Sequence, residues 1–231
     1  GLRSIAEKLK CNYQVCDVSK EYNVSELVRE VQFKFGHIDL FCSNAGVFFK
    51  DKLGSVTLDN KYWEEAWQVN MMSHVYAARY ALPQMIERQS GYFLQIISAA
   101  ALLSQIGAAT YSATKSAAMS FAESIAISYG RAGIKVSAAC PQYVATPMLG
   151  FDNAEEFKDN DNLISADEAA IRIIDGVLHE KFLILTDPNV ISFFERKCKD
   201  YDRWIKGMQN LRREIVDETG EIDLSQMHRF I

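Results

Sequence analysis

Residues 92–140 read YFLQIISAAALLSQIGAATYSATKSAAMSFAESIAISYGRAGIKVSAAC, and this stretch decides the fold. Its two end runs, Tyr92–Ser98 and Ile134–Cys140, are short and mostly apolar, which is typical of strands buried on both faces of a sheet. Between them, Tyr111–Tyr129 has the length and composition of an α-helix. A strand, a crossover helix and a second strand predict a βαβ unit with parallel strands.

The same alternation of apolar runs and amphipathic stretches continues on both sides of this unit. It predicts strands at Asn12–Cys16, Ile38–Ser43 and Phe182–Thr186, and helices at Val24–Phe35, Trp63–Arg88 (with Pro83 as a kink or break) and Ala166–His179. The fold class is therefore α/β, with a doubly wound parallel sheet in a single domain over residues 1–187.

The remaining segments are expected to belong to that same domain. Residues 188–231 are interpreted as its C-terminal helical extension, helical over Phe193–Leu211 and irregular beyond. Residues 150–165 are polar and acidic, and we expect them to run over the surface rather than to link two domains.

Composition excludes several classes of protein. The 231 residues are 48% hydrophobic and 24% charged, which is ordinary for a globular domain. A net charge of −5 gives no electrostatic reason to expect nucleic acid or an anionic membrane as partner. No run approaches the ~18 apolar residues of a membrane helix, and the first residues are typical of an amphipathic helix rather than a signal peptide. We therefore expect a cytoplasmic protein.

The cysteines and histidines carry no metal-binding pattern. Five cysteines lack any C-x-x-C spacing, and Cys16, Cys42 and Cys140 lie in apolar runs that predict buried thiols in a reducing compartment. The four histidines are scattered along the chain, so no metal site is expected.

The strongest chemical signal is the pair Tyr111 and Lys115 at the start of a predicted helix. Residues four apart lie on the same helical face, one turn from each other. An ammonium about 4 Å from the phenol, at an effective dielectric near 20, would favour the phenolate by roughly 4 kcal/mol before desolvation. That corresponds to a pKa lowered by roughly three units from about 10. The alternative is a half-exposed tyrosine beside a solvated lysine, which a lone Y-x-x-x-K cannot distinguish.

Two other polar positions follow predicted strands, and a third lies within the helix predicted over 63–88. Ser98 ends a strand, where the carboxyl ends of parallel strands border a ligand crevice, although it could simply cap the following loop. Asn44-Ala45-Gly46 follows another strand at the same edge, and Gly46 would let a ligand approach the backbone. Asn70 is polar in an apolar stretch, and its ordinary use would be to satisfy a neighbouring backbone group.

Together these residues resemble the short-chain dehydrogenase/reductase family in order and spacing over roughly residues 1–187. The matching positions are Asp17 after a strand, Asn44-Ala45-Gly46, Asn70, Ser98, Tyr111-Ser112-Ala113-Thr114-Lys115 and Pro141-Gln142-Tyr143-Val144-Ala145-Thr146-Pro147-Met148. The resemblance implies a Rossmann-like fold and an NAD- or NADP-dependent oxidoreductase that interconverts a carbonyl and a secondary alcohol. It does not reveal which cofactor or which small-molecule alcohol or ketone is used.

The resemblance also implies a role for each matching residue. Tyr111 would be the general acid/base, Lys115 would lower its pKa and hold the nicotinamide ribose, Ser98 would steady the substrate carbonyl, and Asn70 would hold a water that relays protons. The implied cofactor-binding residues are Asp17 and Val18 at the adenine, Asn44, Ala45 and Gly46 along the adenosine, Tyr111 and Lys115 at the nicotinamide ribose, and Pro141, Val144 and Thr146 near the carboxamide.

Two departures from the family pattern bear on these expectations. The glycine-rich turn T-G-x-x-x-G-x-G and the first strands are missing from this sequence, which opens on Gly1, so we interpret the domain as N-terminally incomplete. Gln142-Tyr143 stands where the family usually has glycine, and Tyr143 is expected to narrow the pocket. An alternative function is therefore a catalytically silent binding or regulatory protein of the same fold, or a structural subunit.

The resemblance extends to assembly and to the substrate cover. Family members commonly pair the helices corresponding to 63–88 and 111–129, so a homodimer or homotetramer is expected. The loop 148–165, with Leu149, Phe151 and Phe157 among acidic residues, is expected to cover the substrate as a partly apolar lid.

Overall fold

The computed structural model describes residues 2–51, 57–151 and 162–230. Within these ranges, four parallel strands form a sheet in the order β1-β2-β3-β6. They are β1 (Leu40–Ser43), β2 (Gly91–Ile96), β3 (Ile134–Cys140) and β6 (Leu183–Leu185). The predicted α/β class is confirmed, and so are these four strands, each within about two residues of its expected ends.

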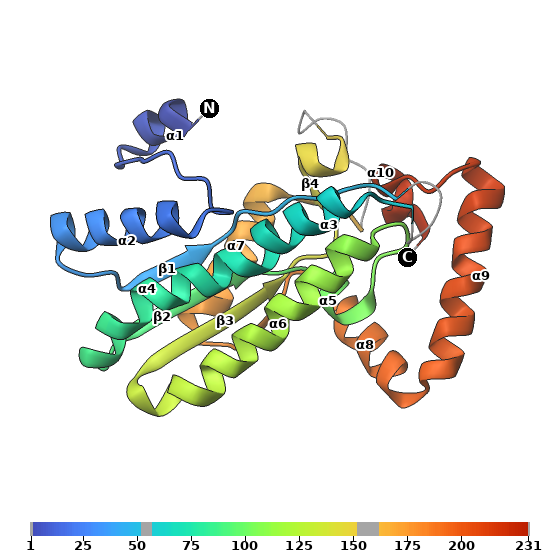
Figure 1. Cartoon of the computed structure of the whole chain (residues 1–231). Helices are drawn as coiled ribbons and strands as arrows, with labels where there is room; N and C mark the ends of the chain where they lie inside the picture. Colours follow the sequence, from blue (N-terminus) through green and yellow to red (C-terminus); the bar gives the residue numbers. More distant parts are fainter. Residues whose placement is uncertain (1, 52–56, 152–161, 231) are drawn as a thin grey trace.

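Helices cover both faces of this sheet, as Figure 1 shows. One face packs on α2 (Glu21–Phe35), α4 (Ser73–Glu87) and α6 (Ala109–Tyr129), and the other on α7 (Ala166–Leu178). Side chains along β2 alternate accordingly, because Phe93 joins the first core cluster and Leu94 the second. The sheet is therefore doubly wound, and its carboxyl edge is left open between the helices.

The helix predicted over 63–88 begins earlier and changes its winding midway. It consists of α3 (Asn60–Trp67), a π-helical turn over Gln68–Met72, and α4, which accommodates Pro83 in its interior. Asn70 lies at the centre of the π turn and is fully buried. Such turns are frequent at functional sites, but composition alone does not signal them.

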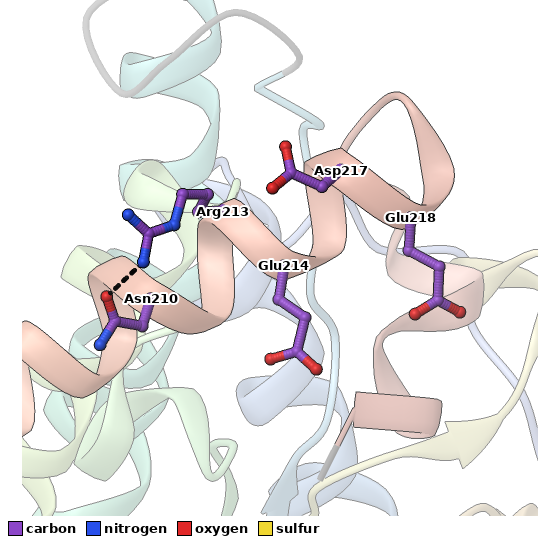
Figure 2. A pocket seen from close by; sticks show the side chains of 5 residues that line it. All are labelled: Asn210, Arg213, Glu214, Asp217 and Glu218. Atoms are coloured by element: carbon purple, nitrogen blue, oxygen red, sulfur yellow. Dashed lines mark hydrogen bonds between the residues drawn. The ribbon is translucent and has the colours of Figure 1, made fainter.

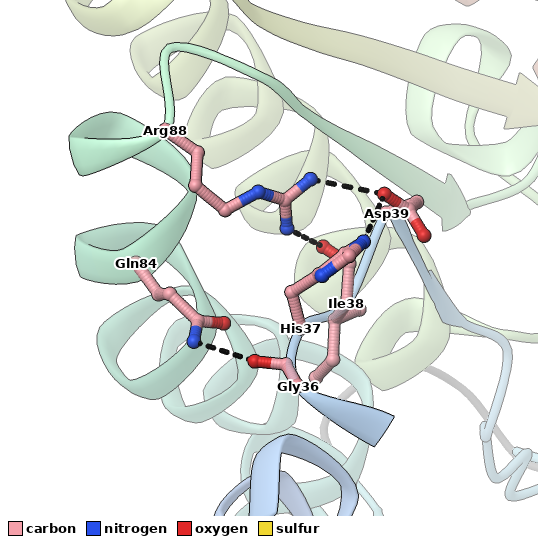
Figure 3. A network of polar contacts seen from close by, with 6 residues as sticks. All are labelled: Gly36, His37, Ile38, Asp39, Gln84 and Arg88. Atoms are coloured by element: carbon pink, nitrogen blue, oxygen red, sulfur yellow. Dashed lines mark hydrogen bonds and ion pairs between the residues drawn. The ribbon is translucent and has the colours of Figure 1, made fainter.

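At the amino end of the strands, opposite the carboxyl edge of the sheet, a polar network anchors the start of β1 to α4 (Figure 3). The Gln84 amide donates to the Gly36 carbonyl at 2.9 Å, and Arg88 donates to the Ile38 carbonyl and pairs with Asp39 at 2.9 Å. Gly36 ends α2 with a φ of 87°, a conformation that favours glycine. These contacts hold the α2–β1 turn and so set where β1 enters the sheet.

Two predictions about the N-terminal part are wrong. Asn12–Cys16 forms no strand, because β1 is an edge strand and no described strand lies beside its open edge to supply backbone partners. For the same reason Cys42 on β1 is exposed and Cys16 is only partly buried, whereas Cys140 on the central β3 is fully buried as expected.

The C-terminal extension is more helical than predicted. It contains α8 (Asn189–Lys199), α9 (Tyr201–Thr219) and the short α10 (Leu224–Met227) in place of one helix over Phe193–Leu211. The two long helices are separated at Asp200, which has extended backbone. The Asp200 carboxylate accepts from the Arg203 backbone N–H at 2.9 Å. This is an N-cap that starts α9 in a new direction. The smaller elements are α1 (Leu2–Leu9), α5 (Ala100–Leu103), and a second, two-stranded sheet of β4 (Val144–Ala145) and β5 (Ile164–Ser165).

Candidate active site

The carboxyl edge of the sheet borders a cleft of about 670 Å³. Segments that follow β1, β2 and β3 line it, as expected for the ligand crevice of an open α/β sheet. The predicted site residues that line it are Asn44, Ala45, Gly46, Ser98, Tyr111, Lys115, Pro141, Val144 and Thr146.

Tyr111 and Lys115 enter the cleft from the first two turns of α6. Lys115 is 2% exposed, and its Nζ donates to the Ile96 carbonyl at the end of β2 at 3.0 Å. The same Nζ lies 5.6 Å from the centroid of the Tyr111 ring. The ammonium therefore faces the ring, but a backbone carbonyl of the sheet is its direct partner.

Ser98 is placed by the continuation of strand pairing beyond β2. The Ile97 N–H donates to the Ala139 carbonyl at 2.7 Å, and the Ala99 N–H donates to the Pro141 carbonyl at 2.8 Å. These bonds fix the backbone on both sides of Ser98 at the cleft. Its hydroxyl forms a side-chain hydrogen bond with Tyr111 and also accepts from the Ala100 N–H at 3.1 Å. The capping role considered from sequence is thus present together with the contact to the phenol.

The pKa values of Tyr111 and Lys115 differ from those expected from the spacing of the two residues. Burial raises the pKa of Tyr111, and the hydrogen bond with Ser98 opposes that rise. Burial also lowers the pKa of Lys115 to about 8. The predicted lowering of the Tyr111 pKa by Lys115 is therefore wrong for this structure, because desolvation of the phenolate outweighs the other contributions.

Two groups behind the cleft are held neutral. Burial raises the pKa of Cys140 to about 12, so its thiol stays protonated and unreactive. Burial and the Lys115 charge lower the pKa of His74 to about 3. Of these three neighbouring side chains, Lys115 is therefore the one that carries a charge at neutral pH.

The Asn70 side chain links the π turn to the segment after β1 and to α6, both of which carry site residues. Its side-chain oxygen accepts from the Val47 N–H at 2.8 Å, and its amide donates to the Val47 carbonyl at 2.9 Å and to Thr114 at 3.1 Å. These bonds satisfy a backbone segment, which is the ordinary use considered from sequence. They also hold the segment at Val47, directly after Gly46, against α6.

Gly46 forms a close backbone approach within the cleft. A Cβ at this position would lie 3.4 Å from the Asn70 side-chain oxygen and 3.5 Å from the Lys115 Nζ. Any larger side chain would occupy the space in front of the lysine. The glycine therefore keeps that side of the cleft open for a ligand.

Some predicted residues lie elsewhere, and several residues that line the cleft were not predicted. Among the described residues, the cleft lining includes neither Asp17 nor Val18, and Asp17 instead accepts from the backbone and hydroxyl of Ser19. Gln105 and Phe48 line the cleft without having been singled out, and Phe48 packs edge-on against Tyr111 at 5.6 Å. Their loop positions give no periodic signal. Part of the expected lid, including Phe157, lies outside the described residues, although Met148 and Leu149 do line the cleft.

A second hollow lies on the outside of α9 and has a different character. Figure 2 shows Glu214, Asp217 and Glu218 spread along the helix instead of converging on one point, while Arg213 donates to Asn210 at 2.9 Å. Across the described residues, no group of three or more histidine, cysteine or acidic side chains is arranged to hold a metal ion. Nor is any described helix both long and apolar enough to cross a membrane.

The fold and this serine–tyrosine–lysine cleft define an α/β protein of the doubly wound class. The family model for short chain dehydrogenase matches residues 2–156, and the chain belongs to that family.

Individual relatives match over most of the chain. The 1-deoxy-11-beta-hydroxypentalenate dehydrogenase of Streptomyces avermitilis is 31% identical over 176 residues, covering 75% of this chain and 64% of that protein. A CLA biosynthesis dehydrogenase/reductase of Lactiplantibacillus plantarum is 33% identical over 140 residues, covering 59% of this chain and 48% of that protein. The chain thus spans between about half and two thirds of the length of these curated relatives.

Solved structures show the same fold at low identity. A short-chain dehydrogenase/reductase from Burkholderia phymatum in complex with NAD has a TM-score of 0.76 at 21% identity, covering 87% of this chain and 81% of that one. A gluconate 5-dehydrogenase from Burkholderia cenocepacia in complex with NADP and tartrate has a TM-score of 0.69 at 22% identity, covering 82% and 80%.

Proposed function

We propose that the protein is a nicotinamide-dependent oxidoreductase that interconverts a carbonyl and a secondary alcohol. The observation that carries this proposal is the meeting of Ser98, Tyr111 and Lys115 in one cleft, with the serine hydrogen-bonded to the phenol. The family membership and the dehydrogenase names of the relatives support it.

We expect the cleft to hold the nicotinamide end of NAD or NADP. Backbone lines it at Asn44–Gly46, where Gly46 keeps space in front of the Lys115 ammonium. Lys115 would donate to the hydroxyls of the nicotinamide ribose. Val144 and Thr146 would contact the carboxamide from the opposite wall. Bound there, the cofactor would supply or accept the hydride, while the protein orients the substrate and moves the proton.

The protein's own part of the reaction is a proton transfer at the Tyr111 Oη. Because its pKa is raised, Tyr111 is protonated at neutral pH and can donate its proton to a carbonyl oxygen as the carbonyl is reduced. The Ser98 hydroxyl would donate to the same oxygen and stabilise the charge that develops there. In the oxidative direction the phenolate is needed, and the Lys115 charge and the Ser98 hydroxyl both favour it.

We also propose that Asn70 belongs to the path that returns protons to Tyr111. It lies in a π turn, a feature that is frequent at functional sites. Its buried side chain is already bonded to Val47 and Thr114, so a relay water would use the remaining polar groups of this turn.

All five cysteines are free thiols, which supports the further proposal of a cytoplasmic location.

The substitution Tyr111→Phe tests the acid/base assignment. Because the phenyl ring keeps the packing against Phe48 but cannot transfer a proton, we expect turnover of secondary alcohols to fall by about 100-fold or more. Cofactor affinity, measured by nicotinamide fluorescence, should stay within a few-fold of wild type. Wild-type turnover in this variant would contradict the proposal. Ser120→Ala, on the same helix and outside the cleft lining, is the matched control.

A further inference from the structure

A cavity of about 660 Å³ lies between the α8–α9 hairpin and the loop that follows α5. It is distinct from the active-site cleft and from the hollow on the outside of α9. Its size falls within the about 300–1,000 Å³ typical of small-molecule sites. Most of its wall is apolar and comes from one stripe of α9 together with the end of the chain. Its apolar lining includes Phe193, Trp204, Leu211, Ile215 and Phe230.

This cavity adjoins the active-site cleft through a shared wall. Four residues line both spaces: Ala100, Gln105, Gln142 and Tyr143. The Tyr143 hydroxyl donates to the Gln105 side-chain oxygen at 3.0 Å, so these two side chains stand at the boundary. Tyr143 therefore does narrow the cleft, and it does so on the side that borders this cavity.

Cations gather on one rim of the cavity, at the turn between α8 and α9. The rim carries Arg196, Lys199 and Arg203 against the single carboxylate of Asp200, which gives it a net positive charge in a chain whose net charge is −5. Within the described part of the chain, neither the Lys199 ammonium nor the Arg203 guanidinium has an ion-pair partner.

The other end of α9 lacks this excess of positive charge. There, Glu214, Asp217 and Glu218 (Figure 2) are accompanied by Arg212 and Arg213 on the helix and by Arg229, which pairs with Glu218 at 3.9 Å. An anionic group is therefore attracted more strongly to the α8–α9 turn than to the far end of the helix. The cavity thus has an apolar interior, one basic rim and a wall that it shares with the active-site cleft.

We propose that this cavity holds the apolar tail of an elongated substrate that ends in a carboxylate. The substrate class is a medium- or long-chain hydroxy or oxo carboxylic acid. Its reacting carbon would lie at Ser98 and Tyr111, its chain would pass Tyr143, and its carboxylate would lie near Lys199 and Arg203. The reacting end of this assignment rests on the proposed function, but binding of the tail does not depend on turnover.

Gly207 offers a direct way to close the cavity. It lines the cavity from the middle of α9, and a Cβ built on it meets nothing within 4 Å. A larger side chain therefore enters open space without displacing its neighbours. Phenylalanine also has a higher helix propensity than glycine, so Gly207→Phe is expected to fold with an unchanged or raised Tm.

The first experiment measures binding of dodecanoate and of 1-dodecanol by titration calorimetry, without cofactor. We expect dodecanoate to bind the wild-type protein and to bind Gly207→Phe at least about tenfold more weakly. Gln209→Phe is the matched control, because it adds the same ring to an exposed position on the opposite side of α9 and should bind as wild type. Absence of dodecanoate binding in the wild type, or equal binding by Gly207→Phe, would overturn the proposal.

The second experiment separates the carboxylate from the tail. Lys199→Gln combined with Arg203→Gln should weaken dodecanoate binding several-fold and leave 1-dodecanol binding unchanged. Equal loss for both ligands would overturn the carboxylate assignment. If Gly207→Phe changes the molecular mass in light scattering and leaves binding intact, the cavity is a contact between copies of the chain and not a ligand site.

The variant Tyr111→Phe distinguishes the proposed acid/base role of Tyr111 from the proposed binding site for the substrate tail. It should bind dodecanoate as wild type while losing turnover. Retained turnover together with cavity-dependent binding would refute the acid/base role alone, and lost turnover without any dodecanoate binding would refute the tail site alone.

Discussion

Lys115 is buried as a charge whose direct partner is a single backbone carbonyl, and this arrangement has a cost in stability. Lowering its pKa from 10.5 to about 8 corresponds to about 3 kcal/mol. Between these two pH values the unfolded chain binds more protons than the folded one, so stability rises with pH there. The cost is fully present below about pH 8 and is relieved as the pH approaches 10.5.

Lys115→Met should therefore stabilise the protein while removing activity. Methionine keeps the apolar stem, and losing the bond to Ile96 offsets about 1 kcal/mol of the gain, which leaves about 2 kcal/mol at pH 7. Urea unfolding at pH 7 and pH 10 measures this difference, which should shrink at the higher pH. A less stable variant at pH 7 would mean that the ammonium is better solvated than its burial indicates.

At this scale, the sequence predicted which candidate residues meet but not their electrostatics. The spacing of Tyr111 and Lys115 correctly placed both side chains in one cleft. It could not show that Lys115 would turn to the Ile96 carbonyl or that burial would raise the Tyr111 pKa. Those facts depend on packing between α6 and β2, which helical periodicity does not contain.

The turn between α6 and β3 shows how one glycine sets the position of two elements. Gly133 has a φ of 77°, and a Cβ there would lie 2.0 Å from the Gln89 carbonyl oxygen of the turn before β2. The close contact aligns the starts of β2 and β3, which pair from Gly91 and Ile134. Gly130, three residues earlier, has helical backbone, and a Cβ added to it would meet nothing within 4 Å.

Two alanine substitutions test this contrast within a single turn. Gly133→Ala combines a strained φ with a backbone clash and should destabilise the protein by about 2–4 kcal/mol. Gly130→Ala should be neutral or stabilising by up to about 1 kcal/mol. Thermal unfolding of both variants measures the difference, and equal Tm values would show that the turn relaxes without displacing β3.

Periodicity predicted the strands that pair with described neighbours, and it missed features that depend on individual hydrogen bonds. β3 was predicted to the residue because it is central and apolar along its length. Asn12–Cys16 has strand composition without a described partner, and the π turn at Asn70 and the break at Asp200 arise from hydrogen bonds that leave no periodic trace.

For the molecule as a whole, the placement of apolar side chains bears on its assembly. In the two helices expected to pair between subunits, Ala78, Ala81 and Ala122 of α4 and α6 pack in the core of the same chain. By contrast, α7 presents Ile171, Ile174 and Leu178 to solvent at 68%, 56% and 76% exposure. These residues follow one helical face, and a contiguous apolar stripe of this kind marks an association surface.

We therefore expect a homodimer in which the α7 stripes of two copies face each other across a two-fold axis. Ile174→Glu would bury a carboxylate against its own copy, so light scattering should show a shift to monomer and the Tm should lose its dependence on protein concentration. Ile127→Glu is the comparison, because Ile127 is exposed on α6, where the family resemblance predicts the contact. Dissociation by Ile127→Glu with Ile174→Glu still dimeric would move the interface to α6. If neither charge changes the mass, both surfaces face solvent in the assembled protein.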